Sequence, residues 1–349
     1  MIPSMARLTR NAPHLARGGV LAAARGRFAL NTHPPVRHFS GEQRAFMQAI
    51  REGHALSVQV HLDCGIDPNF VDKGDMSPLM VAALAGNSPV VDLLLENGAD
   101  HRYPIRFGLN PMLAAALKGH DEVIRIFLDR GAAVDLACRE GMNALLAAAM
   151  KGHCNVVQLL IERGANLQHT CSRGLGALLL AAAGGHVEMV DLLLHAGCDP
   201  HQVDQDGRSA LMAAAEGGHS LVMLRLLARG VQVDHQDDYG STALMEAAWH
   251  GHEEALVELM KGGADVEIQN KKRQSARTLA EAAGQSVILE LLTGETRAAV
   301  SGSGPAQAVQ VGAESEESVA DSVATGGRRD PTERGDGEGG HSARVRLAQ

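Results

Sequence analysis

Aromatic residues are scarce in this chain. Phe, Trp and Tyr together make up 3% of its 349 residues, and there is a single Trp. We therefore do not expect a core filled by large rings, and predict one built from Leu, Val and Ala. Hydrophobic residues nevertheless reach 45%, which excludes a wholly disordered protein.

Long apolar runs, paired cysteines and an excess of positive charge are also missing. The longest uncharged apolar run covers residues 175–185, whereas a transmembrane helix needs roughly 17–25 residues, so we predict no integral membrane segment. Five Cys without a CxxC pair argue against a disulfide scaffold or a zinc finger. Lys and Arg total 32 against 41 for Asp and Glu, and the net charge of −9 argues against binding to nucleic acid.

Acidic residues are absent from the N-terminus up to Glu42, while the same stretch carries several Arg. This composition is typical of organelle transit peptides, and Arg37-His38-Phe39-Ser40 resembles a mitochondrial processing site. We predict that residues 1–39 are a transit peptide and that the mature chain lies in the mitochondrial matrix. Plastid import and a basic leader on a cytoplasmic protein are the alternatives. N-terminal sequencing of the native protein tests this: a chain starting at Ser40 supports import, and an intact N-terminus contradicts it.

The C-terminal end differs in composition from the middle of the chain. Residues 294–349 are rich in Gly, Ser, Ala and Glu and show no sustained apolar period. Such a segment cannot bury enough apolar surface to offset its ordering entropy, so we predict that it is disordered.

The middle of the chain repeats itself with a fixed period. A Gly followed by a polar residue recurs every 33 residues, at Gly53, Gly86, Gly119, Gly152, Gly185, Gly218, Gly251 and Gly284. A second Gly recurs with the same period, at Gly65, Gly98, Gly131, Gly164, Gly197, Gly230 and Gly263. A period of this length is typical of a solenoid built from one supersecondary unit.

The sequence of each unit predicts two short helices. In one of them, an Ala-rich apolar segment over residues 144–149 is broken by Gly152-His153. Apolar residues at helical spacing follow over 156–161, and Gly164 stands where a helix C-terminus favours a left-handed residue. No unit can bury its apolar face alone, so we predict that stacking of neighbours makes the core.

These units resemble ankyrin repeats. The resemblance is carried by Thr242-Ala243-Leu244-Met245 followed by Gly251-His252, and by Ser77-Pro78-Leu79-Met80. It covers residues 42–292 and implies an all-α ankyrin-repeat solenoid of stacked helix-turn-helix units with hairpin loops. We predict a degenerate first unit (42–71), six full repeats and a C-terminal cap (270–292). The family's usual His in its TPLH segment is replaced here by Met or Leu, and we expect apolar contact in its place.

No motif or group of residues in the sequence indicates a catalytic or metal site. P-loop, nucleophile-elbow, HExxH and dinucleotide-binding patterns are all missing. The 17 His are the remaining candidates, but six of them follow the recurring Gly, about 10 Å apart along the stack, too far to share one metal. Cys138 and Cys171 are also one period apart, beyond the reach of a disulfide. We predict no cofactor, and structural roles for these residues.

The family resemblance implies that partners bind the concave face, which is made of the hairpin tips and first helices. We predict outward-facing positions from the repeat register. Its N-terminal half is basic and apolar, with Arg106, Phe107, Arg139, Met150 and Lys151. Its C-terminal half combines charged residues with two large aromatics, and comprises Arg208, Glu216, Tyr239, Trp249 and His250. Glu246, on the same first helix as Trp249, is a further candidate, although other repeats carry Val, Ala or Leu there. Trp, Tyr and Arg are the residue types most enriched in binding hot spots.

For Trp249 and Glu246 a second interpretation stays open. Trp249 could cover the neighbouring repeat without touching a partner. Glu246 could orient a basic group of a partner or bond the adjacent repeat.

The sequence as a whole predicts a monomeric, non-catalytic adaptor or scaffold that binds a protein partner of unknown identity. A regulatory subunit of an enzyme on another chain is the alternative, and an enzyme with a site built across repeats is the competing class. Co-purification would separate the first two, because a stoichiometric enzyme partner indicates regulation and varied partners indicate a scaffold.

Overall fold

The computed structural model describes residues 41–72, 74–102 and 109–293. The predicted transit peptide (1–39), the predicted disordered tail (294–349), Arg106 and Phe107 lie outside the described residues.

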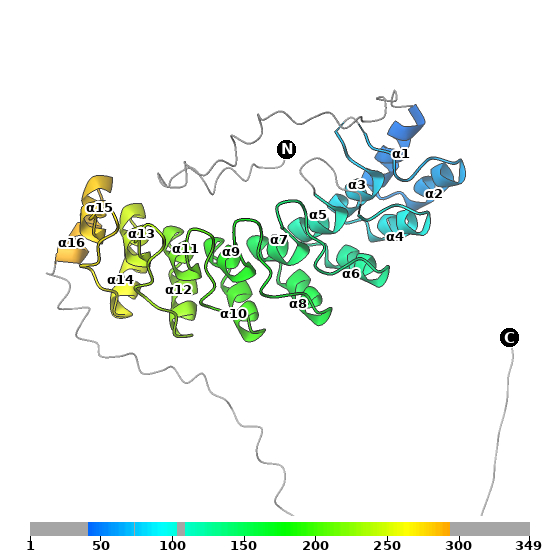
Figure 1. Ribbon diagram of the computed structural model, residues 1–349. Helices are drawn as coiled ribbons and strands as arrows, with labels where there is room; N and C mark the ends of the chain where they lie inside the picture. The colour runs from blue at the N-terminus through cyan, green and yellow to red at the C-terminus, as the bar shows by residue number, and fades with distance from the viewer. Residues whose placement is uncertain (1–40, 73, 103–108, 294–349) are drawn as a thin grey trace, which may run out of the picture. The chain divides into compact units, whose positions relative to one another are not determined.

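Within the described ranges the chain forms sixteen helices in eight pairs, joined by loops (Figure 1). They are α1 (Gly41–Glu52), α2 (Ala55–Asp63), α3 (Pro78–Ala85), α4 (Ser88–Glu96), α5 (Pro111–Lys118), α6 (Asp121–Asp129), α7 (Ala144–Lys151), α8 (Cys154–Glu162), α9 (Ala177–Ala183), α10 (Val187–His195), α11 (Ala210–Glu216), α12 (Ser220–Leu227), α13 (Ala243–His250), α14 (Glu253–Lys261), α15 (Ala276–Ala283) and α16 (Ser286–Thr293). The all-α solenoid predicted from the sequence is confirmed.

The helices stack in two rows. Odd-numbered helices pack against the next odd-numbered helix, and even-numbered helices against the next even-numbered one. In the odd row, small side chains such as Ala147, Ala148 and Ala149 are fully buried, so the backbones can approach closely. In the even row, branched residues such as Val156 and Leu160 are fully buried between neighbours. We name the surface formed by the odd-numbered helices and the loop tips beside them the first-helix face.

Local signals in the sequence set where the odd-numbered helices begin and end. Ahead of α5, the Asn110 side chain accepts a hydrogen bond from the backbone N–H of Leu113 at 2.8 Å, which caps the helix. After α5, Gly119 adopts a left-handed φ of 77°. A Cβ at Gly119 would lie 2.7 Å from Nδ1 of His153, so both the backbone conformation and the close approach require glycine.

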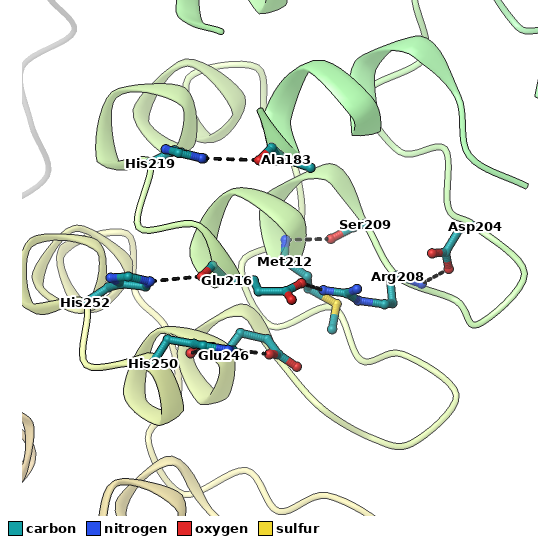
Figure 2. Close-up of polar contacts among 10 residues, drawn as sticks. All are labelled: Ala183, Asp204, Arg208, Ser209, Met212, Glu216, His219, Glu246, His250 and His252. Carbon is teal, nitrogen blue, oxygen red and sulfur yellow. Dashed lines mark hydrogen bonds and ion pairs between the residues drawn. The ribbon is translucent and has the colours of Figure 1, made fainter. Parts of the chain in front are cut away.

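From Gly86 onward, the residue after each recurring Gly joins its repeat to the preceding one. Nε2 of His120, His153, His186, His219 and His252 lies 2.9–3.3 Å from a backbone carbonyl oxygen in the repeat before. Two of these bonds, from His219 to Ala183 and from His252 to Glu216, are drawn in Figure 2. Five of the six histidines that follow the recurring Gly therefore bond neighbouring repeats, and in each bond the Nε2–H donates.

We expect His219 to make the fold sensitive to acid. Burial lowers its pKa below the ordinary 6.5, the neighbouring His252 and His186 lower it further, and only the bond to Ala183 opposes the shift. The unfolded chain therefore takes up a proton first, and stability falls as the pH drops from 6.5 to the lower pKa of the folded state.

Replacing His219 with Asn should reduce this loss, because the Asn side chain does not titrate. The bond between repeats can be kept, since Asn87, at the same repeat position, donates to the Ile50 carbonyl of the preceding repeat at 2.8 Å. The measurement is the change in melting temperature between pH 7.5 and 5.5, with His201→Asn at an exposed site as the control. An unaltered pH dependence in His219→Asn would contradict the assignment.

The described part of the chain offers neither a membrane span nor a metal-binding cluster. None of its helices has the length and apolar character needed to cross a bilayer. Its His, Cys, Asp and Glu residues form no group of three or more that could hold a metal ion. All five cysteines are free thiols.

Candidate protein-binding surface

Short hairpin loops hold the tips of the first-helix face in register. In the loop before α13, Oδ1 of Asp237 accepts hydrogen bonds from the backbone N–H groups of Tyr239 (2.9 Å) and Ser241 (2.7 Å). The next loop repeats this turn with Asn270. The two tips are joined, because the Lys271 N–H donates to the Tyr239 carbonyl at 2.9 Å. The backbone that carries Tyr239 is therefore fixed on both sides.

A hollow of about 210 Å³ opens between this pair of loops and the helices α13 and α15. We name it the Trp249 hollow; its lining is Tyr239, Ser241, Met245, Glu246, Trp249, Asn270, Lys271, Lys272, Gln274 and Leu279. Tyr239 is 46% exposed, and Trp249 is half-buried. Two aromatic side chains that reach solvent from a hydrogen-bonded backbone can offer a large contact area to a partner.

The structure brings three of the predicted binding residues into this hollow: Tyr239, Glu246 and Trp249. Sequence reasoning missed the residues on its far wall, Lys271, Lys272 and Gln274. Continuing the repeat register one unit further would have found them, because they stand 33 residues after Asp238, Tyr239 and Ser241.

The prediction that Arg208 faces outward is wrong. Arg208 is only 8% exposed, because its guanidinium turns along α11 and forms an ion pair with Glu216 (Figure 2). The two residues were predicted as separate surface groups, and they lie at the loop before α11 and at the end of α11. Arg208 is therefore unavailable as an exposed anchor for a partner.

Glu246 is buried on α13, with 3% of its surface exposed. Burial raises the pKa of its carboxyl group to about 7; the nearby Arg208 opposes this shift, and Glu216 and Asp237 add to it. Its backbone carbonyl lies 3.0 Å from Nδ1 of His250, which is half-buried one turn further along the helix. Figure 2 shows Glu246 and His250 on one helix, α13, next to the ion pair between Arg208 and Glu216.

The N-terminal half of the predicted surface is more open. Arg139 is exposed at a hairpin tip and Lys151 is exposed at the end of α7, while Met150 beside it is half-buried. The carbonyl oxygen of Met150 accepts the inter-repeat bond from His186. These residues form a basic, apolar stretch of the first-helix face.

Comparison with protein families gives matches along most of the chain. A model described as ankyrin repeats (3 copies) matches residues 28–105, 101–171 and 178–297. A second model, ankyrin repeats (many copies), matches residues 155–194. A search of curated proteins found no match.

Proposed function

Because the chain belongs to the ankyrin repeat family, whose repeats generally mediate protein–protein interaction, we propose that it is a non-catalytic module that binds a protein partner on its first-helix face. The observation that carries the proposal is the Trp249 hollow. It combines two ring side chains, Trp249 and Tyr239, with a buried acid, Glu246, on a scaffold fixed by hydrogen bonds between loops. Trp and Tyr are enriched among the residues that carry most of the binding energy, which cluster near the centre of an interface.

We expect Trp249→Ala to weaken partner binding by about 2 kcal/mol or more, because it removes the largest anchor. A partner identified by proximity labelling in the native cell is purified, and its affinity is measured beside thermal unfolding. Leu221→Ala is the matched control, since Leu221 lies on α12 in the even row and is 64% exposed. The control should bind as the unchanged chain does.

One result would assign partner binding to another part of the surface. If Trp249→Ala leaves the affinity unchanged but clearly lowers the melting temperature, Trp249 is a packing residue between repeats. The basic stretch with Arg139 and Lys151 would then be the better candidate surface.

A further inference from the structure

The positive charges of the array differ in their pairing between its two sides. On the side of the even-numbered helices, five cations each form an ion pair with a carboxylate: Arg125, Arg130, Arg163, Arg225 and Lys261. On the first-helix face, four exposed cations in three consecutive repeats form no ion pair with any described residue: Lys118, Arg139, Lys151 and Arg173. We use the name basic stretch for these four residues.

Acidic residues are scarce on the same surface. By the repeat register, the hairpin tips and first helices of these repeats cover residues 103–118, 136–151 and 169–184. Glu140 is the single Asp or Glu in these three ranges. Asp135, just outside them, already accepts a hydrogen bond from the backbone of the next repeat. The acids of these repeats lie on the second helices, such as Asp129 on α6 and Glu162 on α8, so they do not neutralise the basic stretch.

A purely structural role for the lysines does not account for this pattern. Lys118 and Lys151 end α5 and α7, where a positive charge is favoured by the helix dipole. Other repeats hold Ala85 or Gly184 at the same position, so the ends of these helices do not require a cation. The two arginines of the stretch lie in hairpin tips, where the dipole argument does not apply.

The charge of the first-helix face reverses towards its C-terminal half. Asp206 stands at the repeat position of Arg173, one repeat later, and Asp238 stands at that of Arg139, three repeats later. The face therefore has a basic end and an acidic end. A partner segment with negative charge is directed to the basic end by attraction and kept from the other end by repulsion.

Apolar side chains precede the two lysines of the stretch. Leu117 and Met150 occupy the same repeat position and are half-buried, so each still offers surface to a partner. The carbonyl of Leu117 accepts the inter-repeat bond from His153, and that of Met150 accepts the bond from His186. Cations and apolar groups therefore recur together on a hydrogen-bonded backbone.

The spacing of the lysines matches the period of an extended peptide. Lys118 and Lys151 are one repeat apart, and packed helices lie about 8–10 Å apart. In the polyproline II conformation, three residues advance by about 9 Å and bring the side chain back to the same side. A peptide with an acid at every third position can thus present one carboxylate to each repeat.

We propose that the basic stretch binds an extended acidic segment of the protein partner. Carboxylates three residues apart face Lys118 and Lys151, and Arg139 and Arg173 contact the segment from the hairpin tips. A single exposed ion pair contributes little, so the affinity depends on several carboxylates that bind together. This inference rests on the proposed binding function and specifies the charge of the partner.

The test adds the full chain to a fluorescein-labelled peptide of four Glu-Leu-Ser repeats and records fluorescence anisotropy. A peptide with Gln in place of Glu is the neutral analogue, and one with the four Glu in a block keeps the charge but not the spacing. We expect saturable binding of the first peptide and binding of the Gln peptide at least about tenfold weaker, with the blocked peptide in between. Salt at about 0.5 M should weaken the binding, because it screens exposed charges.

Paired variants localise the effect. Lys118→Gln combined with Lys151→Gln should weaken binding of the acidic peptide about tenfold or more. Arg125→Gln combined with Arg225→Gln, at exposed positions on α6 and α12, changes the net charge equally and should leave binding unchanged. Circular dichroism checks the fold of each double variant.

A second pair of substitutions keeps the test decisive if the lysine variant does not fold. Arg139→Gln combined with Arg173→Gln removes the charges of the hairpin tips without touching a helix, and should also weaken binding by about tenfold.

Four results overturn the proposal. Unchanged affinity in the folded variants would assign the peptide to another basic region of the chain. Equal binding of the Gln peptide would show that charge does not matter, and equal binding of the blocked peptide would contradict the three-residue spacing. Tighter binding of oligouridylate than of the acidic peptide would assign the stretch to nucleic acid.

Failure of this proposal is distinguishable from failure of the binding function. A partner whose binding depends on Trp249 but is unchanged in the lysine variant keeps the binding surface and contradicts the acidic segment. Binding of the acidic peptide by a chain whose first-helix face engages no partner protein does the reverse.

Discussion

Replacing Leu160 with Ala is expected to lower the free energy of unfolding by about 2–5 kcal/mol. Leu160 is fully buried on α8, which packs against α6 on one side and α10 on the other. Truncation leaves a cavity that these neighbours cannot fill without moving. In a stacked array each repeat stabilises the next, so a defect in the middle weakens two interfaces at once.

Leu292→Ala gives the matched comparison at the end of the described array. Leu292 is 8% exposed on α16, whose even-row neighbour is α14. Leu292→Ala should therefore lower the free energy of unfolding clearly less than Leu160→Ala does. Urea unfolding of both variants measures the difference, and equal shifts of the midpoint would argue against mutual stabilisation of neighbouring repeats.

The fold could be predicted from the sequence because its determinants are local and recur. The Gly at position 119 is needed for a left-handed backbone beside the ring of His153, and this requirement returns every 33 residues. The apolar spacing around Leu160 then indicates which side of each helix is buried. A signal repeated eight times along the chain is far stronger than any single motif.

The site could be predicted only in part, because a repeat register gives a residue's place on the backbone and not the direction of its side chain. The register correctly brought Tyr239 and Trp249 to one region. It could not show that Arg208 would turn inward, since this depends on Glu216 lying eight residues later on the same side of α11. The partner of a long charged side chain depends on which groups lie near it in the folded chain, and the repeat register does not give this.

The pair formed by Arg208 and Glu216 replaces apolar residues. One repeat earlier the same two positions hold Leu175 and Ala183, and two repeats earlier Met142 and Met150. The ion pair is not fully satisfied, because Nε of Arg208 is buried without a hydrogen-bond partner in the described ranges. A buried pair of this kind is often no more stabilising than well-packed apolar residues of similar volume.

We therefore expect opposite results from breaking the pair and from replacing it. Arg208→Met leaves Glu216 and Glu246 close together without their buried cation, and should lower the free energy of unfolding by about 3 kcal/mol. We choose the lower end of the range for breaking buried pairs because 24% of the Glu216 side chain is exposed. The loss should shrink on going from pH 8 to pH 6, since protonation removes the repulsion between the carboxylates.

The double variant Arg208→Met, Glu216→Met recreates the pair of methionines found two repeats earlier, and should regain most of the stability lost in the single variant. The His252 side chain bonds the backbone carbonyl of residue 216, so this bond does not involve the replaced side chain. Urea unfolding of the unchanged chain, the single variant and the double variant at both pH values measures the effect. A double variant as unstable as the single one would show that the ion pair itself, rather than the relief of buried negative charge, stabilises this repeat.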